Sequence, residues 1–167
     1  PFLDGNGRIG RLLITFLLCV EGALPGPLLY LSAYLERHRQ RYYDLLCNVS
    51  ATGDWSSWIS FLLEGFEEQA KDAIVRSRRV RDLQDHYRHI LQEARASGNT
   101  HTLLDEFFQH PFITPAMARD RLGVTYMGAK GVLERLRSLG IIRPAGVKGM
   151  TMFVANELLE VIEVPTA

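Results

Sequence analysis

The residues with the most evident chemistry lie at the start of the chain, between Asp4 and Arg11. This stretch holds one acid, a Gly-Asn-Gly turn and two arginines, and it leads into an apolar helix that we predict from Ile9 to about Val20. A glycine-rich turn at a helix N-terminus exposes backbone N–H groups, and the helix dipole favours an anion there. Arg8 and Arg11 fall on one helix face because three residues make nearly one turn. A divalent cation held by Asp4 would take phosphate oxygens to complete its shell. The stretch therefore predicts a magnesium-polyphosphate site.

The same residues carry a resemblance to a known family. From Phe2 to Arg11 the chain reads Phe-Leu-Asp-Gly-Asn-Gly-Arg-Ile-Gly-Arg. From its Phe onward, the motif His-x-Phe-x-(Asp/Glu)-Gly-Asn-Gly-Arg-x-x-Arg is matched at every fixed position, so the chain resembles the Fic family (Fic/Doc superfamily). The motif histidine would stand immediately before Pro1. Because the chain begins with Pro inside a motif, we expect it to be a piece of a longer protein, truncated just after that histidine.

The resemblance implies a reaction and a role for each motif residue. Fic proteins move AMP from ATP to a Ser, Thr or Tyr hydroxyl of a protein (AMPylation), and the histidine would take the hydroxyl proton. By this resemblance, Asp4 would hold Mg²⁺ against the phosphates. The N–H groups of the Gly-Asn-Gly turn and the Asn6 side chain would form an anion hole. The two arginines would bind the β- and γ-phosphates. The expected catalytic residues are therefore Asn6 and Arg8, and the expected ATP-binding residues are Gly5, Asn6, Gly7, Arg8 and Arg11.

One glycine of the motif distinguishes two branches of the resembled family. In the branch that phosphorylates, which includes Doc-like toxins, Lys replaces the second Gly of the turn, so Gly7 favours nucleotidyl transfer. We therefore expect the full-length protein to be a Fic-type adenylyltransferase that uses ATP and Mg²⁺. This chain alone is expected to be inactive because it lacks the base. The expected partner is a protein substrate, with self-modification included. The alternative is a DNA-binding transcriptional regulator whose Fic part senses nucleotide or is degenerate.

Composition adds few limits on function. Lys+Arg and Asp+Glu both number 19, for zero formal net charge, so nothing at this level points to nucleic acid, a membrane surface or an acidic partner. The sequence has no apolar run of transmembrane length. Cys19 and Cys47 stand in apolar helical contexts, and we expect two buried thiols and no disulfide. With the resemblance to bacterial Fic proteins, this predicts a cytoplasmic location.

Residues 1–70 are interpreted as the C-terminal part of a Fic helical domain, with three helices. The opening helix is apolar nearly all round and is predicted to be central and buried. A second helix is predicted to begin with Ser32 as its N-cap residue. In the resembled family this helix lies beside the nucleotide site. By this resemblance Tyr34 or Tyr42 would flank the adenine, since an aromatic face stacks on any base, and the alternative is that both are plain core aromatics. A third helix is predicted after the turn Thr52-Gly53-Asp54.

The third helix contains a loose match to an inhibitory pattern of the resembled family, Ser/Thr-x-x-x-Glu-Gly/Asn. The matching residues are Ser60 to Gly65. We interpret this as a chance match because the apolar residues at 61–63 explain the stretch as ordinary core helix.

The helical pattern continues to Ala94, and residues 71–98 are predicted to be a charged connecting helix. Such a helix is a connector or a homodimer contact. The alternative is that it places its cluster of four arginines, between Arg76 and Arg81, against nucleic acid. Ala96-Ser97-Gly98-Asn99 is the expected domain boundary.

Residues 99–167 have the pattern of a winged helix-turn-helix, with three helices and a β-hairpin. Helices are predicted at 102–109 and 116–122, the second after Thr114-Pro115. A third helix is predicted to be capped by Thr125 and stopped by Gly140. Two strands are predicted at Ile141-Ile142 and Met150 to Val154, joined by a turn over 143–149.

This part resembles the winged-helix domains that follow the Fic domain in many bacterial members. Its third helix would be the reading helix, offering Tyr126, Lys130, Arg135 and Arg137. From Thr100 onward acidic and basic residues balance, whereas phosphate contacts dominate DNA affinity. A protein-binding or autoregulatory role is therefore preferred, with DNA as the alternative partner. The whole chain is expected to be mainly α.

Overall fold

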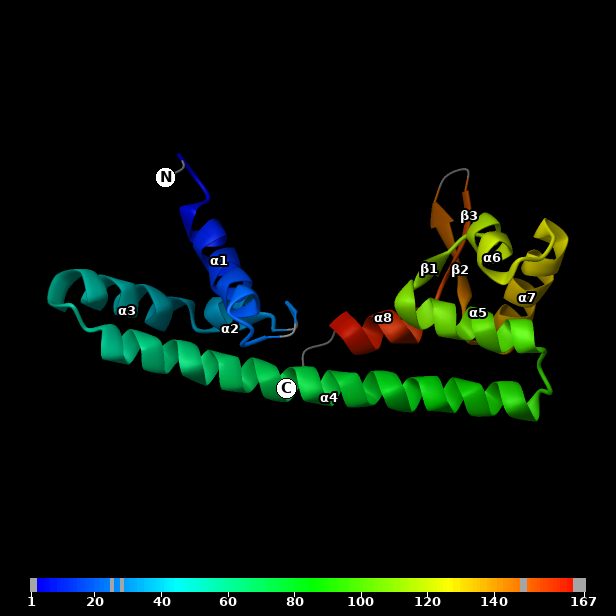
Figure 1. Cartoon of the computed structure of the whole chain (residues 1–167), viewed down its shortest axis with the longest axis horizontal. Coiled ribbons are helices and arrows are strands. Elements are labelled where there is room, and N and C mark those ends of the chain that lie inside the picture. The colour runs from blue at the N-terminus through cyan, green and yellow to red at the C-terminus, as the bar shows by residue number, and fades with distance from the viewer. Residues whose placement is uncertain (1–2, 25, 28, 148–149, 164–167) are drawn as a thin grey trace. The chain divides into compact units, whose positions relative to one another are not determined.

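The computed structural model of the chain describes residues 3–24, 26–27, 29–147 and 150–163. In these ranges helices dominate and one small antiparallel sheet accompanies them (Figure 1), which confirms the mainly α fold. The chain divides into two compact units, Pro1–Val75 and Arg76–Ala167, and each is taken by itself below. None of the helices in the described ranges combines the length and the apolar character that a membrane span needs.

The first unit contains α1 (Asn6–Val20), α2 (Leu31–Arg37), α3 (Arg39–Thr52) and the first half of α4 (Trp55–Glu93). Its core is a cluster of buried side chains from α2, α3 and α4: Leu31, Tyr34, Leu35, Tyr42 and Phe61. The ring centroids of Tyr34 and Phe61 lie 5.1 Å apart, so aromatic packing joins α2 to α4.

α1 begins earlier than predicted and is largely exposed. It starts at Asn6 and not at Ile9, directly after Gly5, whose φ of +83° lies in the left-handed region. All of α1 lies in the described part of the chain, and none of its side chains is buried. Leu12 is 70% exposed and Phe16 57%. The prediction of a central, buried helix is therefore wrong. Apolar periodicity reports which face a helix could bury, and in this unit α1 packs against the described core through Ile14.

The predicted second helix is in fact two helices. α2 begins at Leu31 after Tyr30, so the prediction of Ser32 as the N-cap residue is wrong. His38, with φ −106° and ψ 32°, separates α2 from α3. Beyond this break, α3 carries the guanidinium of Arg41 over the ring of Phe61, 5.0 Å from its centroid. This contact joins two helices that are distant in sequence, so no local sequence signal predicts it.

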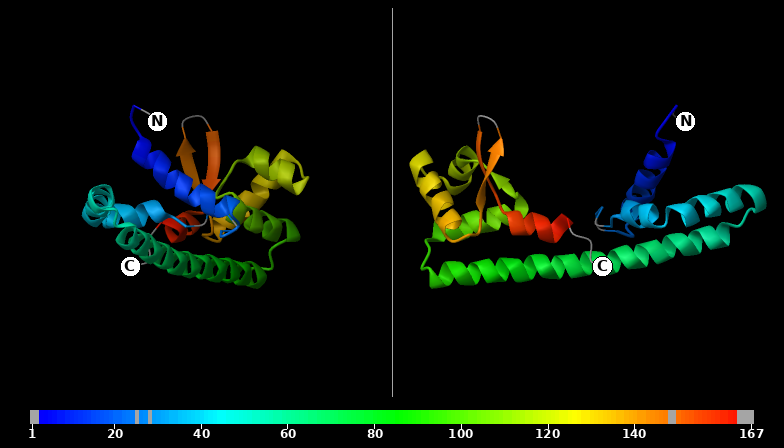
Figure 2. Two further views of the ribbon diagram at one scale, coloured as in Figure 1. Left: turned by 60° about the vertical axis from the view of Figure 1, so that its left-hand side comes forward. Right: turned by 180° about the vertical axis from the view of Figure 1, so that it is seen from behind.

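The predicted turn before the long helix is confirmed. Gly53 ends α3 with φ +73°, a conformation that glycine adopts without strain. The Asp54 carboxylate then accepts the N–H of Ser57 at 3.1 Å and so caps α4. Hydrogen bonds from the Ser57 hydroxyl and N–H hold the pKa of Asp54 below its usual range. α4 continues to Glu93 (Figure 2).

The second unit contains the rest of α4 and then α5 (Gly98–Gln109), β1 (Phe112–Ile113), α6 (Pro115–Leu122), α7 (Tyr126–Ser138), β2 (Arg143–Val147), β3 (Met150–Val154) and α8 (Asn156–Glu163). The strands form an antiparallel sheet in the order β1-β3-β2 (Figure 1). α5, α6 and α7 followed by the β2–β3 hairpin give the succession expected for a winged helix-turn-helix.

Local signals predicted both ends of α6 and of α7, whereas α5 begins at Gly98 and not at the predicted residue 102. Thr114 and Thr125 cap α6 and α7, and each hydroxyl accepts the N–H three residues later, at 3.2 and 3.1 Å. Gly123 ends α6 with φ +63°, and Gly140 follows α7 with φ +77°. A capping hydroxyl and a left-handed glycine act within one turn, so they can be recognised without knowledge of the tertiary fold.

The hairpin differs from its prediction. Ile141 and Ile142 are buried but precede β2, so the prediction of a strand at these two residues is wrong. Residues 143–147, predicted as part of the turn, instead pair with β3, from Arg143 opposite Val154 onward. A short apolar run signals burial and cannot by itself distinguish a strand from a buried loop. The remaining turn residues, 148–149, lie outside the described residues.

Two elements were not foreseen. β1 pairs with β3 over two residues, too few to show a strand period. α8 lies in a stretch for which no helix or strand was predicted, and its Leu158 is fully buried. Glu157 of α8 accepts a hydrogen bond from the Tyr87 hydroxyl at 2.8 Å. Burial and this carboxylate raise the pKa of Tyr87.

The second half of α4 contributes to the core of this unit. Tyr87 and Leu91 are buried in the same cluster as residues of α5, α7 and the sheet. This stretch belongs to residues 71–98, for which the sequence predicts a connecting helix. Residues 94–97 join α4 to α5 inside the second unit, so the stretch 96–99, expected as a domain boundary, falls on this connection and the first two residues of α5.

Candidate functional site

The motif residues surround the N-terminus of α1. Asp4 precedes Gly5, its carboxylate accepts the Gly5 N–H at 2.6 Å, and its other oxygen lies 3.5 Å from Arg8 Nη2. The first N–H groups of any α-helix have no carbonyl one turn earlier to bind. The first turn of α1 contains no acid. This end of the helix therefore favours an anion.

Both motif arginines fold back beside the glycines. A Cβ added to Gly5 would lie 3.6 Å from Arg8 Nη2, and one added to Gly7 would lie 3.6 Å from Arg11 Nη1. Two guanidinium groups therefore flank the start of α1, each with planar donors suited to phosphate oxygens. The structure brings these residues together with Asp4 at one helix end.

Asp4 has the exposure and the chemistry of a magnesium ligand. Its side chain is 94% exposed. In proteins Mg²⁺ is typically held by one or two carboxylates together with substrate phosphates and water. The arginines can donate hydrogen bonds to phosphate but cannot ligate a cation. The carboxylate of the motif that can ligate Mg²⁺ is therefore that of Asp4. The donor set fits a magnesium-triphosphate complex.

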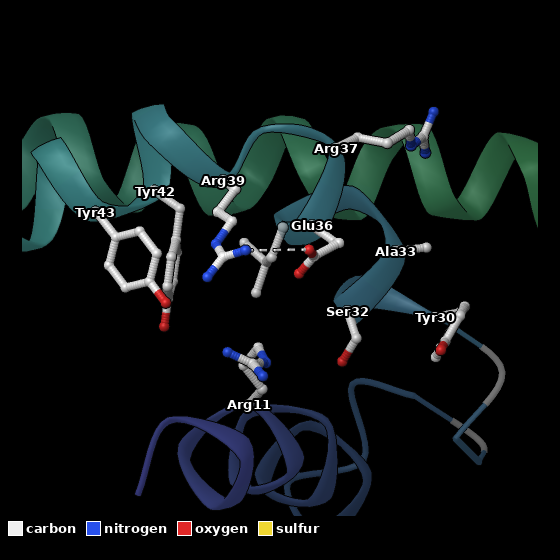
Figure 3. A pocket seen from close by; sticks show the side chains of 10 residues that line it. Arg11, Tyr30, Ser32, Ala33, Glu36, Arg37, Arg39, Tyr42 and Tyr43 are labelled. Atoms are coloured by element: carbon white, nitrogen blue, oxygen red, sulfur yellow. Dashed lines mark ion pairs between the residues drawn. The ribbon is translucent and has the colours of Figure 1, made fainter. Parts of the chain in front are cut away.

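Two adjoining hollows extend from this helix end. One, of about 360 Å³, is lined by the motif, from Leu3 to Arg8, and by Arg11 and Tyr43. The other, of about 410 Å³, lies between α1 and the α2–α3 segment (Figure 3). Its polar and aromatic lining includes Arg11, Ser32, Glu36, Arg39, Tyr42 and Tyr43. Arg11 and Tyr43 line both hollows, so a ligand held at the motif could extend into the second one.

The tyrosines of α2 and α3 have three different positions. Tyr34 is 3% exposed, and its hydroxyl donates to Glu64 at 3.4 Å. Burial and that carboxylate raise the pKa of Tyr34, which is a core residue. Tyr42 belongs to the core and also lines the cleft. Tyr43, which was not predicted as a site residue, is 47% exposed and lines both hollows. The sequence did contain a signal for this position. Tyr43 directly follows Tyr42 and so lies about 100° further around the helix, away from the face that Tyr42 buries.

Glu64, in the stretch that resembles an inhibitory pattern, binds Arg41. The distances are 2.7 Å to Nη1 and 3.3 Å to Nη2. The hydrogen bond from Arg41 holds the pKa of Glu64 below its usual range. Phe61 in the same stretch is fully buried, and Gly65 lies against the ring of Tyr34. Packing thus accounts for Phe61 and Gly65, and the ion pair with Arg41 accounts for Glu64. Leu63 is 61% exposed, so the expectation that all three apolar residues at 61–63 lie in the core is wrong for this one.

The residues proposed for the reading helix belong to the second unit and do not act as a group. Tyr126 and Lys130 are exposed one turn apart on α7. Arg135 instead donates to the Ala94 carbonyl at 3.0 Å, at the end of α4. Arg137 lies 3.1 Å from Glu134, so its charge is partly compensated. The sequence predicts that these residues share one helix, but it does not show which of the guanidinium groups form hydrogen bonds or ion pairs within the unit.

Both cysteines are free thiols, as expected, but their burial differs from the prediction. Cys19 is partly buried and Cys47 is exposed. The expectation of two buried thiols is wrong, because α1, which carries Cys19, buries none of its side chains and α3, which carries Cys47, buries only Tyr42.

No protein-family model matches the chain.

Proposed function

We propose that this chain carries the ATP-binding part of a Fic-type protein adenylyltransferase. In the intact protein the reaction would transfer AMP from ATP to a Ser, Thr or Tyr hydroxyl of a protein. The main support is the convergence of Asp4, the N-terminus of α1 and two arginines at one hollow that adjoins a tyrosine-lined cleft. This arrangement suits an anionic ligand that has both a polyphosphate and an aromatic part.

The residues of this chain would bind and orient the triphosphate. Arg8 and Arg11 would hold the terminal phosphates with charged hydrogen bonds. The N–H groups at the start of α1 and the Asn6 side chain would stabilise the negative charge that develops at the α-phosphate. These donors are fixed by the helix backbone, so they need little reorganisation when the bond to the leaving group breaks.

Asp4 would hold Mg²⁺ beside the phosphates, and the ion would there neutralise charge on the pyrophosphate leaving group. The proposal further requires a histidine immediately before Pro1 in the intact protein, to take the proton of the attacking hydroxyl. The preference for nucleotidyl over phosphoryl transfer rests on the resemblance alone, in which glycine at the position of Gly7 marks the nucleotidyl-transferring branch. We further propose that the activity belongs to the bacterial cytoplasm and acts on a protein substrate, the protein itself included.

The test is transfer of label from α-phosphate-labelled ATP, with Mg²⁺ and bacterial lysate, by the intact protein. Labelled protein bands are expected, and Asn6→Ala should abolish them while leaving the fold unchanged by circular dichroism. A residue other than His before Pro1, or equal labelling by Asn6→Ala, would remove the enzyme proposal.

DNA binding is retained as a second candidate because α7 presents Tyr126 and Lys130 to solvent directly after a tight turn from α6. Phosphate contacts would have to come from residues that are partly paired within the unit, such as Arg137. A gel shift at moderate salt with the protein's own upstream region should give retention that Lys130→Ala weakens. Absence of retention would remove this candidate.

A further inference from the structure

The four clustered arginines of α4, from Arg76 to Arg81, belong to the second unit, and three of them face solvent. Arg76 is partly buried, and its Nη1 donates to the Ile162 carbonyl of α8 at 3.3 Å. Arg78, Arg79 and Arg81 are exposed. Among the residues that the structure describes, none of these three guanidinium groups has an ion-pair or hydrogen-bond partner. Three adjacent positive charges therefore lie open on one stretch of helix.

Most other arginines of this unit are engaged within it. Carboxylates of the unit bind Arg88, Arg119, Arg121 and Arg137. Arg135 donates to the Ala94 carbonyl, and Arg143 donates to the Asn156 side chain. Like charges placed side by side repel, so three adjacent arginines without partners are a feature that folding alone does not explain. An anionic partner would compensate them.

The exposed face of α4 in this unit is charged and has no apolar part. Its apolar residues turn inward, and Tyr87 is buried in the core of the unit. Arg78 lies nine residues before Tyr87 and therefore about 180° around the helix from it. Between residues 76 and 93, all of which the structure describes, no large apolar side chain is exposed. The nearest ones, Ile74 and Val75, precede this stretch and belong to the first unit.

This composition distinguishes between classes of anionic partner. A protein interface has an apolar centre, and a helix that lies on a membrane has an apolar face. A protein that binds single-stranded nucleic acid stacks the bases on exposed aromatic rings. The exposed face over residues 76–93 has none of these features. A nucleic-acid duplex requires none of them, because its backbone is bound through charge alone.

From this pattern we infer that Arg78, Arg79 and Arg81 bind the phosphate backbone of a nucleic-acid duplex. The planar guanidinium group donates two parallel hydrogen bonds to phosphate oxygens, which suits arginine to this role. Phosphate contacts carry no sequence information, so the surface binds duplexes of any sequence. Asp82, exposed one turn after Arg78, opposes the phosphates and limits the affinity.

This surface is distinct from the two sites proposed above. In Figure 1, α5 lies between α4 and the α6–α7 pair, so the exposed residues of α7 are not part of the arginine surface. The motif at the start of α1 belongs to the other unit. The inference therefore rests neither on the transfer of AMP nor on sequence reading by α7.

The experiment measures binding of the full chain to a short DNA duplex of mixed sequence by fluorescence anisotropy, over a series of salt concentrations. Each phosphate contact with duplex DNA contributes about −0.9 to the slope of log K against log salt. Three arginines therefore contribute about −2.7, or a loss of roughly 40-fold in affinity between about 50 and 200 mM salt. Two duplexes of unrelated sequence should bind equally.

Matched variants test the assignment. Each of the three Arg→Gln substitutions should make the slope shallower by about 0.9, and the triple variant by about 2.7. The triple Arg→Lys variant keeps the charges and should keep the slope. Asp82→Asn should lower the Kd because it removes a repelling carboxylate. Arg119→Gln, the control, changes the net charge equally but removes an arginine that already binds Asp120 at 2.7 Å, and it should leave the slope unchanged. Urea midpoints should match the wild type for the changes at the three exposed arginines.

Four results would overturn the inference. The wild type could fail to bind the duplex at about 50 mM salt. The triple Arg→Gln variant could keep the wild-type slope. Lys130→Ala could remove binding that the triple variant retains, which would place the duplex on α7. Polyglutamate, or vesicles of phosphatidylserine and phosphatidylcholine, could bind more tightly than the duplex. In the intact protein the triple variant should still transfer label from α-labelled ATP, so this surface and the proposed activity fail or stand separately.

Discussion

Gly65 lies on α4 against the ring of Tyr34, and its replacement by Ala tests whether packing explains this glycine. A Cβ at position 65 would lie 2.5 Å from Cδ1 and 2.8 Å from Cε1 of Tyr34. Tyr34 is 3% exposed, and its ring packs against His38 and Phe61. The ring therefore cannot move aside without disturbing the core of the first unit. Overpacking of this kind costs about 1–3 kcal/mol.

The same substitution also has a favourable part. Ala is about 1 kcal/mol better than Gly in a helix interior. The net effect of Gly65→Ala is therefore a destabilisation of about 0–2 kcal/mol. Gly10→Ala is the matched control because a Cβ there would meet no atom within 4 Å. It should stabilise the chain by about 1 kcal/mol. The two variants should therefore differ by about 1–3 kcal/mol.

Urea unfolding followed by tryptophan fluorescence measures this difference. Trp55 and Trp58 both belong to the first unit, so the signal reports on that unit. If Gly65→Ala stabilised the protein as much as Gly10→Ala, the packing explanation would be wrong. The resemblance of Ser60–Gly65 to an inhibitory helix would then need to be considered again.

Four further changes follow from the contacts described above. Arg11→Ala should weaken ATP binding by about 1.5–3 kcal/mol, the value of a hydrogen bond to a charged group, and calorimetry that finds no change would exclude its role. Thr125→Ala should destabilise the chain by about 1 kcal/mol through loss of the α7 cap, measured as a lower urea midpoint. Tyr87→Phe should cost about 1.5–3 kcal/mol because it leaves Glu157 without its 2.8 Å donor, and an unchanged midpoint would show that this bond contributes nothing. Arg41→Ala should make stability less dependent on pH at the acid end: Arg41 lowers the pKa of Glu64 in the folded state, so the stabilisation is present above the carboxyl's ordinary pKa and is lost as the pH falls through the folded value. Urea midpoints at pH 7 and pH 3 check this, and an equal drop in the variant and the wild type would count against it.

Features that act within one helical turn were predictable from the sequence. The hydroxyls of Thr114 and Thr125 cap their helices as expected, and Gly53 and Gly123 adopt the left-handed conformation that ends a helix. The grouping of the motif at the start of α1 was predictable for the same reason, because Asp4 to Arg11 span about two turns.

Features that depend on distant parts of the chain were not predictable. The break at His38 and the exposure of α1 depend on which other elements are present to pack against them. β1 is a strand only because β3 lies beside it. Arg135 was expected to face a partner and instead binds the end of α4, a contact across 41 positions of sequence. The role of Tyr43 in lining a hollow could not be predicted either, because that hollow exists only through the position of α1.

The central claim is that the motif presents ATP for transfer of AMP and not of phosphate. Incubating the intact protein with lysate and Mg²⁺, in parallel with α-labelled and γ-labelled ATP, tests this claim directly. The account predicts protein labelling from the α-position alone. Labelling from the γ-position, or from neither, would contradict it.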